Sequence, residues 1–225
     1  MIFLPISWIT FQKKKTKAKH LKGIPMPSQT PPSSTNDRSE RELMLANEMY
    51  APTDPELQKM HMQARELMHA YNNSAPRDNN GRHKILKELL GGMGDAVEIR
   101  APFFCDYGKH IYLGSTVFMN YNCVILDCNE VRIGDNVMFG PYVQVYTAYH
   151  PLEAGPRNSG RELAAPITIE DNVWLGGGAI ICPDVTIGKN SVIGAGAVVT
   201  KSVPANVFAG GNPCKVIKEI ENPTN

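Results

Sequence analysis

The chain has 225 residues, a formal net charge of +1 and a charged fraction of 20%. A chain of this length can hold one main domain and a small appendage. Its near-neutral charge, without runs of stacking aromatic residues, argues against a nucleic-acid partner. The five cysteines are odd in number and have no short-spaced pairs, so we expect reduced thiols, no zinc site and a cytoplasmic location.

The first segment of the chain, Met1 to Phe11, is apolar. The basic run from Lys13 to Lys15 follows this stretch, which is the reverse of the order in a secretory signal. The stretch is also shorter than the roughly 20 residues of a membrane span, so we expect no membrane partner. Residues 25–39 are rich in Pro, Ser, Thr and Asn, a composition typical of a disordered linker. We therefore expect residues 1–38 to be a disordered leader and linker.

Apolar residues recur at helical spacing between residues 40 and 90. A short first helix is expected around residues 43–50. Asp54 followed by Pro55 is a capping and first-turn signal for a second helix, which should end near Asn72. The sequence Asn79-Asn80-Gly81 is expected to be a turn before a third short helix. Residues 39–95 are thus predicted to form a small N-terminal helical domain.

From residue 97 onward the apolar residues have a period of six. Small or branched residues recur four places after each leading position, and Gly often follows it. This period fits neither a helix nor an alternating hairpin and is typical of a parallel β-helix, whose coils bury their inner faces by stacking. We therefore predict a mainly β fold, with a β-helix over residues 96–220. The leading positions are Leu113, Met119, Ile125, Ile133, Phe139, Val145, Ile169, Leu175, Ile181, Ile187, Ile193 and Val199.

The repeat is interrupted twice, by two extra residues near Val131 and by a longer stretch after His150. The hexads that begin at Val145 and Ile169 remain in phase. Residues 151–166 can therefore leave a corner as an extruded loop, the kind of segment that often carries function on a rigid scaffold. Spacing alone leaves open whether His150, at the base of this loop, is a catalyst or a solvated histidine.

Seven motifs in the sequence carry a resemblance to a known family. Together they resemble the maltose and galactoside O-acetyltransferases over residues 41–220, which include the helical segment. The resemblance implies a left-handed β-helix and a homotrimer with active sites between adjacent β-helices. It also implies direct transfer of an acetyl group from acetyl-coenzyme A to a hydroxyl of a small sugar, without a metal. The motifs are Cys105-Asp-Tyr-Gly108, Asn120-Tyr-Asn-Cys123, Thr147-Ala-Tyr-His-Pro151, Arg157-Asn-Ser-Gly160, Asp171-Asn-Val-Trp-Leu-Gly176, Gly194-Ala-Gly-Ala-Val-Val-Thr-Lys201 and Gly210-Gly-Asn-Pro-Cys-Lys215.

The resemblance also implies roles for residues of this sequence. His150 matches the family's general base, and imidazole is a base of suitable strength to accept the proton of a sugar hydroxyl near neutral pH. Asn120 matches a contact to the transition state and the acceptor, although spacing alone favours a structural asparagine at a repeat corner. Asp106, Asp127 and Cys128 match positions at or near the acceptor hydroxyls.

Two departures from the galactoside enzyme bear on the acceptor. Cys128 stands where that enzyme has an acidic residue, and Pro52 replaces an acid near the end of the first helix. These departures put a galactoside acceptor in doubt and favour glucose or maltose. An amino sugar or a chito-oligosaccharide is the most serious alternative, because the sequence specifies the donor better than the acceptor. Outside the family, a γ-type carbonic anhydrase needs three histidines around zinc, whereas the repeat region has only His110 and His150. A non-catalytic assembly protein would keep the repeats without needing His150.

For acetyl-coenzyme A, the resemblance implies contacts from seven residues. Basic side chains suit the nucleotide phosphates, but Lys215 and Lys218 stand where the galactoside enzyme has arginines, so bidentate pairing is lost. Gly177 replaces a serine of some members, so any contact to an oxyanion there must come from a backbone N–H. Trp174 is expected to line the pocket. The seven residues are Trp174, Gly177, Ala195, Thr200, Lys201, Lys215 and Lys218.

Overall fold

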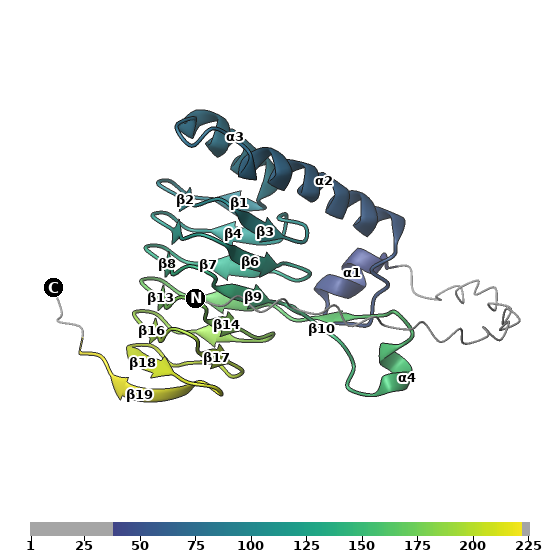
Figure 1. The fold of residues 1–225 in the computed structure, drawn as a ribbon. Coiled ribbons are helices and arrows are strands. Elements are labelled where there is room, and N and C mark those ends of the chain that lie inside the picture. Colours follow the sequence, from purple (N-terminus) through teal and green to yellow (C-terminus); the bar gives the residue numbers. More distant parts are fainter. Residues whose placement is uncertain (1–37, 222–225) are drawn as a thin grey trace, which may run out of the picture. The chain divides into compact units, whose positions relative to one another are not determined.

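The computed structural model describes residues 38–221. The predicted leader and linker therefore lie outside the described residues, apart from Arg38. The described residues 38–221 form one compact unit. Three helices precede a stack of short strands, and the two longer helices cover the end at which the stack begins (Figure 1).

The second helix has the predicted bounds, and the third begins earlier than predicted. The Asp54 carboxylate accepts the first free N–H groups of α2, which ends at Asn72. The sequence at residues 79–81 is the first turn of α3 rather than a separate turn, because the Asp78 carboxylate accepts the Gly81 N–H at 2.9 Å and caps the helix. The three helices are α1 (Glu40–Leu45), α2 (Pro55–Asn72) and α3 (Asn79–Leu89).

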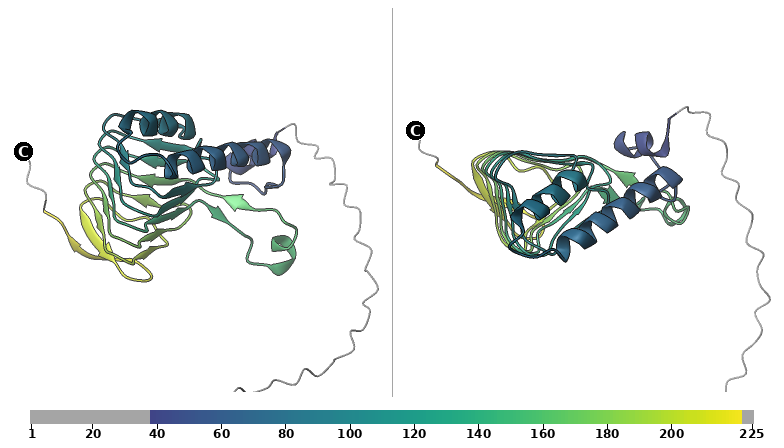
Figure 2. Two further views of the ribbon diagram at one scale, coloured as in Figure 1. Left: turned by 45° about the horizontal axis from the view of Figure 1, so that its top comes forward. Right: turned by 90° about the horizontal axis from the view of Figure 1, so that it is seen from above.

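The strands form three sheets that make the sides of a roughly triangular prism (Figure 2). The first sheet has the order β1-β4-β7-β12-β15, the second β2-β5-β8-β13-β16-β18-β19 and the third β3-β6-β9-β14-β17. Neighbouring strands in these sheets are parallel, except that β19 is antiparallel to β18. The predicted fold class, a left-handed parallel β-helix with a small helical cap, is confirmed.

Successive strands visit the three sheets in turn, so each complete coil contributes one strand to each side of the prism. The strands of the prism are β1 (Gly92–Met93), β2 (Glu98–Ile99), β3 (Phe103–Cys105), β4 (Ile111–Leu113), β5 (Phe118–Met119), β6 (Cys123–Leu126), β7 (Val131–Ile133), β8 (Met138–Phe139), β9 (Gln144–Tyr146), β12 (Ile167–Ile169), β13 (Trp174–Leu175), β14 (Ile180–Ile181), β15 (Thr186–Ile187), β16 (Val192–Ile193), β17 (Val198–Val199), β18 (Val207–Gly210) and β19 (Lys215–Glu219).

The core of the β-helix consists of the predicted leading residues. All of them are buried, and Leu113, the most exposed, shows only 6% of its surface. Complete burial of a large aliphatic side chain contributes roughly 1.5–3 kcal/mol. The same core continues into the helical cap, where Met68 of α2 and Leu89 of α3 belong to one cluster with Ile99 of the first coil. The cap therefore closes the open end of the stack.

The corners of the coils place several asparagines at positive φ, a region that this residue tolerates better than most. Three of them stack at one corner. Asn172 donates its Nδ2 to Asn190 Oδ1 at 2.9 Å, and Asn190 donates to Asn206 Oδ1 at 2.8 Å. This ladder joins successive coils outside the apolar core.

The extruded segment, here named the arm (residues 147–166), begins earlier than the expected residue 151. It contains β10 (Ala148–Tyr149), the short helix α4 (Ala154–Arg157) and β11 (Leu163–Ala164). The two strands pair in antiparallel fashion, and this pairing takes residues before His150 out of the coil. The arm projects from the side of the stack (Figure 1).

Candidate functional site

Two corners of the prism carry the predicted site residues. The arm corner leads from the third sheet to the first and carries the arm. The glycine corner leads from the second sheet to the third and has Gly140, Gly176 and Gly194 at equivalent places in successive coils. A Cβ atom on Gly176 would lie 2.5 Å from the Ala195 nitrogen, so the coils approach too closely here for a side chain.

His150 lies on the arm, directly after β10, and is exposed. The arm ladder pairs Ala148 with Ala164, and both alanines pack in the cluster that contains Tyr50 and Cys128. Side chains alternate between the two faces of a strand. Continued by one residue beyond the end of β10, this alternation would put His150 on the same face as Ala148.

A partly buried group of polar residues lies at the arm corner. We name it the acid cluster and define it as Tyr50, Asp106, Cys128 and Glu162. The Cys128 thiol donates to Asp106 Oδ2 at 3.3 Å, and the Tyr50 hydroxyl donates to Glu162 Oε2 at 3.0 Å. Burial raises the pKa of Asp106, while the Cys128 thiol and His61 oppose this rise and Glu162 adds to it. Asp106 and Cys128 are therefore brought together, as expected for neighbouring acceptor contacts.

Asp127 lies at the same corner as Asp106 and Cys128, but its carboxylate bonds to the backbone. Its side chain is 0% exposed. Its Oδ1 accepts the N–H groups of Asp106 and Tyr107 at 3.0 and 2.8 Å, and its Oδ2 accepts that of His110 at 3.2 Å. These bonds hold the turn that presents Asp106. In this chain Asp127 supports the turn that carries Asp106, and its own side chain is closed to ligands by burial.

We expect Asp127→Asn to lower the free energy of unfolding by about 1–3 kcal/mol, because an amide NH2 would face backbone donors. Burial raises the pKa of Asp127 to about 7, against the opposing effect of its backbone donors. A pKa raised by folding favours the folded state at low pH, and this contribution is lost as the pH rises through about 7. The stability difference between wild type and variant should therefore shrink between pH 5 and pH 8. Urea unfolding at both pH values measures it, and a constant or growing difference would contradict the assignment.

Asn120 lies at the glycine corner, directly after β5. The asparagine at positive φ in this turn is Asn122, so Asn120 is not explained by the corner geometry. Its Oδ1 accepts the N–H of Tyr121 at 2.8 Å. With the oxygen held in this way, the Nδ2 group is left as a donor for a ligand.

Most residues expected to contact coenzyme A lie on the second sheet or at the glycine corner. Trp174 is on the outer face of β13 and is 50% exposed. The N–H of Gly177 donates to no other described residue. Lys215 and Lys218 are exposed on β19, where they pair with Gly210 and Phe208 of β18. Of the other three, Ala195 also lies at the glycine corner, whereas Thr200 and Lys201 follow β17 at the arm corner.

Within one chain, the two corners do not form one site. His150 and Asp106 are at the arm corner, whereas Asn120 and Gly177 are at the glycine corner. The third sheet separates them, and in the second coil its strand β6 has 4 residues. At about 3.3 Å for each residue, this strand spans about 13 Å. A contact of both corners with one small acceptor therefore calls for residues from two chains.

Three further observations concern residues 38–221. In this part of the chain, no three His, Cys, Asp or Glu side chains gather in a group that could hold a metal ion. None of its helices is both long enough and apolar enough to cross a bilayer. The five cysteines are free thiols.

Sequence reasoning missed three residues that build the acid cluster and its support. Tyr50 and Glu162 are 112 positions apart, and no local pattern connects them. Asn129 is buried, and its Nδ2 donates to the carbonyls of Met44 and Ala164, which joins α1 to the arm. The only signal in the sequence was that Glu162 lies in the second half of the extruded loop, where the chain returns to the β-helix.

Comparisons with known proteins match both parts of this fold. Residues 43–94 match the family model described as the maltose acetyltransferase hexapeptide capping motif. Residues 166–201 match the model described as bacterial transferase hexapeptide (six repeats). The galactoside O-acetyltransferase of Escherichia coli K12 is 38% identical over 181 residues, which are 80% of this chain and 89% of that protein.

Solved structures give the same picture. A maltose O-acetyltransferase from Clostridium difficile 630 has a TM-score of 0.82 and 47% sequence identity, over 83% of this chain and 100% of that chain. A hexapeptide-repeat acetyltransferase from Vibrio cholerae, solved in complex with acetyl-coenzyme A, has a TM-score of 0.77 and 37% identity, over 82% of this chain and 100% of that chain.

Proposed function

This chain belongs to the maltose and galactoside O-acetyltransferase family of hexapeptide-repeat acyltransferases, and from this we propose that it transfers an acetyl group from acetyl-coenzyme A to a hydroxyl of a small sugar of the glucose or maltose type. The observation that carries the proposal is the place of His150. An exposed imidazole stands at the base of the arm, directly after β10, whose Ala148 packs in the cluster that contains Cys128, the hydrogen-bond partner of Asp106.

His150 acts as the general base in this proposal. It takes the proton of the acceptor hydroxyl while the hydroxyl oxygen bonds to the thioester carbonyl carbon. The carbon–sulfur bond then breaks, and His150 returns the proton to the leaving sulfur, so the products are an O-acetyl sugar and a free thiol. The Nδ2 of Asn120 and the N–H of Gly177 are available to donate to the carbonyl oxygen as it gains negative charge.

We also propose that the chain acts as a homotrimer, with the arm corner of one copy facing the glycine corner of the next. The separation of His150 from Asn120 within one chain supports this arrangement. So do exposed apolar side chains on the second sheet and the glycine corner, where Tyr121, Met138, Tyr142 and Trp174 are each 49–59% exposed. Apolar side chains gathered on one surface mark interaction sites in soluble proteins.

Acetyl-coenzyme A would then lie between two copies. Trp174 offers an aromatic wall, and the exposed ammonium groups of Lys215 and Lys218 suit the nucleotide phosphates. Thr200 and Lys201 would approach from the arm corner. The free thiols of the chain support a reducing location such as the cytoplasm.

The acceptor proposal rests on the acid cluster. The Cys128 thiol is neutral and donates to Asp106. The acid cluster therefore lacks the negative charge that the galactoside enzyme has at the position of Cys128. A test would incubate the protein with acetyl-coenzyme A and glucose, maltose, a thiogalactoside or glucosamine, and measure thiol release. Faster release with glucose or maltose is expected. A preference for glucosamine or the galactoside would replace the acceptor, and no release with any sugar would favour a non-catalytic role.

A further inference from the structure

A cavity of about 850 Å³ lies between the helical cap and the first coil. We name it the cap cavity. Its lining comes from the end of α2, from α3, from residues 96–101 around β2 and from Tyr121 of the glycine corner. Its volume is in the range of about 300–1,000 Å³ that is usual for small-molecule sites. It is therefore large enough to hold part of a substrate.

The inner wall of the cap cavity is built from side chains that bond to one another. Arg82 donates to Ser74 Oγ and to the Tyr71 hydroxyl, both at 2.8 Å, and its guanidinium lies 4.2 Å from the centre of the Tyr71 ring. Asn72 and the backbone of Phe103 exchange two hydrogen bonds of 2.9 Å. These contacts fix the shape of the wall before a ligand arrives, which reduces the entropy lost on binding.

Arg100 also lines the cavity, but most of its donors are unused. Its Nε donates to Glu98 Oε1 at 3.3 Å. Its guanidinium lies 4.9 Å from the centre of the Phe118 ring and 5.3 Å from that of Tyr121. Neither Nη group donates to a described residue. The guanidinium is thus held beside two rings and a carboxylate, and both Nη groups are left as donors for a ligand.

Arg100 lies next to Asn120 in the neighbouring coil. β2 pairs with β5 so that Ile99 is opposite Met119, and the Arg100 N–H donates to the Met119 carbonyl at 2.9 Å. Arg100 and Asn120 directly follow these paired residues, and neighbouring strands are about 4.8 Å apart. Most residues proposed to contact acetyl-coenzyme A lie on later coils, beyond Asn120. The cap cavity is therefore on the side of Asn120 that coenzyme A leaves free.

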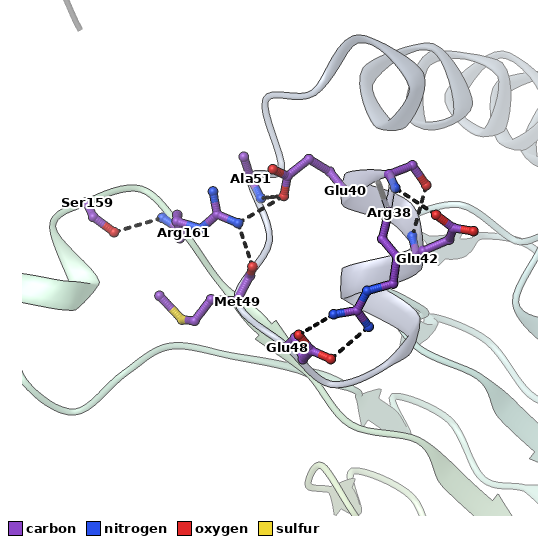
Figure 3. Close-up of polar contacts among 9 residues, drawn as sticks. Arg38, Glu40, Glu42, Glu48, Met49, Ala51, Ser159 and Arg161 are labelled. Atoms are coloured by element: carbon purple, nitrogen blue, oxygen red, sulfur yellow. Dashed lines mark hydrogen bonds and ion pairs between the residues drawn. The ribbon is translucent and has the colours of Figure 1, made fainter. Parts of the chain in front are cut away.

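The arm of the same chain is held at the other end of α2. Arg161 donates to Glu40 Oε2 at 3.1 Å and to the carbonyl of Met49, which joins the returning half of the arm to the segment before α2 (Figure 3). The cap cavity is lined by the end of that helix, and a helix of 18 residues is about 27 Å long. In the proposed trimer, a ligand in the cavity is therefore bound by the copy that supplies Asn120, and His150 comes from the next copy.

The open part of the cavity suits neutral hydroxyl groups better than an anion. Arg100 offers hydrogen-bond donors, and Glu98 beside it offers carboxylate oxygens that would repel a negative charge. A sugar hydroxyl can donate and accept, so it can use both groups. Tyr121 is 49% exposed and adds an aromatic ring for a sugar to pack against.

We propose that the cap cavity is a second acceptor subsite, which holds the next sugar ring of a neutral di- or oligosaccharide whose reacting hydroxyl lies near Asn120. Arg100 and Glu98 are its specificity-determining pair. This inference rests on the proposed function, because it takes Asn120 as part of the reacting site, and it defines the acceptor as a chain of two or more sugars.

The test compares Arg100→Ala with Arg65→Ala, a control whose exposed side chain is on α2 and does not line the cavity. Thiol release gives kcat/KM for maltose and for glucose. Arg100→Ala should lower the ratio of the maltose value to the glucose value by about tenfold or more, the effect of losing hydrogen bonds to a charged group. Arg65→Ala should keep the wild-type ratio. An unchanged ratio in Arg100→Ala would overturn the proposal.

A second variant fills the cavity without changing Arg100. Asn79 lines the cavity at the start of α3 and is exposed. Asn79→Trp should exclude the second ring and lower the same ratio, and a wild-type ratio there would contradict the subsite. Glucose 6-phosphate serves as an anionic acceptor. If Arg100→Ala impaired acetylation of this compound and spared maltose, the cavity would be an anion site and the proposal would be wrong.

A binding measurement separates this inference from the proposed function. Calorimetry with the full chain and maltose, without acetyl-coenzyme A, should show a Kd about tenfold higher in Arg100→Ala than in the wild type. If this loss were seen but no sugar were acetylated, the proposed function would fail and the subsite would stand. Maltose that binds both proteins equally, or binds neither, would overturn the subsite even if sugars were acetylated.

A conservative variant covers the case in which Arg100→Ala does not fold. Arg100→Lys keeps the positive charge but loses the planar fork of donors. It should show a higher Kd for maltose than the wild type, and an unchanged Kd there would overturn the proposal.

Discussion

Replacement of His150 with alanine should lower kcat for sugar acetylation by about 10²–10⁴-fold, the usual contribution of a general base. The KM for acetyl-coenzyme A should stay near its wild-type value, because the residues proposed to contact that substrate are unchanged. His150 is exposed and makes no hydrogen bond to a described residue, so the variant should fold and melt like the wild type. Thiol release at saturating substrates gives kcat, and thermal unfolding gives the stability.

A matched control is His69→Ala, since His69 is also exposed but lies on α2, away from the arm. This variant should retain wild-type kcat. If both variants kept full activity, His150 would not be the general base. The mechanism would then need another proton acceptor. A loss of activity accompanied by unfolding would instead place His150 among the residues that stabilise the arm.

The second large effect is expected from mixing two inactive variants. His150→Ala removes a group of the arm corner, and Asn120→Ala removes a donor of the glycine corner, a change expected to cost about 10²–10³-fold in kcat. If each site takes its arm corner from one copy and its glycine corner from the next, unfolding and refolding an equal mixture should restore about a quarter of the wild-type sites. In such mixed trimers, one copy supplies His150 and its neighbour supplies Asn120.

The control for this experiment is a mixture of His150→Ala with the double variant that lacks both side chains. It should recover no activity, because no copy in it has His150. Two distinguishable affinity tags would verify that mixed oligomers form. Mixed oligomers of the two single variants that remain inactive would show that both groups act from one chain, which would contradict the shared site.

Much of the architecture was available from local sequence patterns. Each coil of a β-helix packs mainly on its two neighbours, so every hexad meets the same requirement and repeats the same solution. For this reason the leading residues from Leu113 to Val199 could be assigned to the core, and they are buried. The bounds of α2 were predictable for a similar reason, because the cap at Asp54 and the apolar stripe are both local signals.

The site depended on contacts that no local pattern records. The period of six indicates which residues point inward, but it does not show that Asp127 is enclosed by the backbone of another coil. Helical spacing likewise could not reveal that Tyr50, beyond the end of α1, pairs with Glu162 in the arm.

By itself, the sequence determined the stack of coils and the loop that leaves it without changing the phase of the repeat. Its motifs also determined the family. Only the tertiary structure decided which predicted residues share a corner, that Asp127 supports Asp106, and that Glu162 pairs with Tyr50. The physical reason is that repeats encode interactions between neighbouring coils, which recur along the chain. The acid cluster instead depends on single contacts between distant segments, and these contacts exist only after the chain has folded.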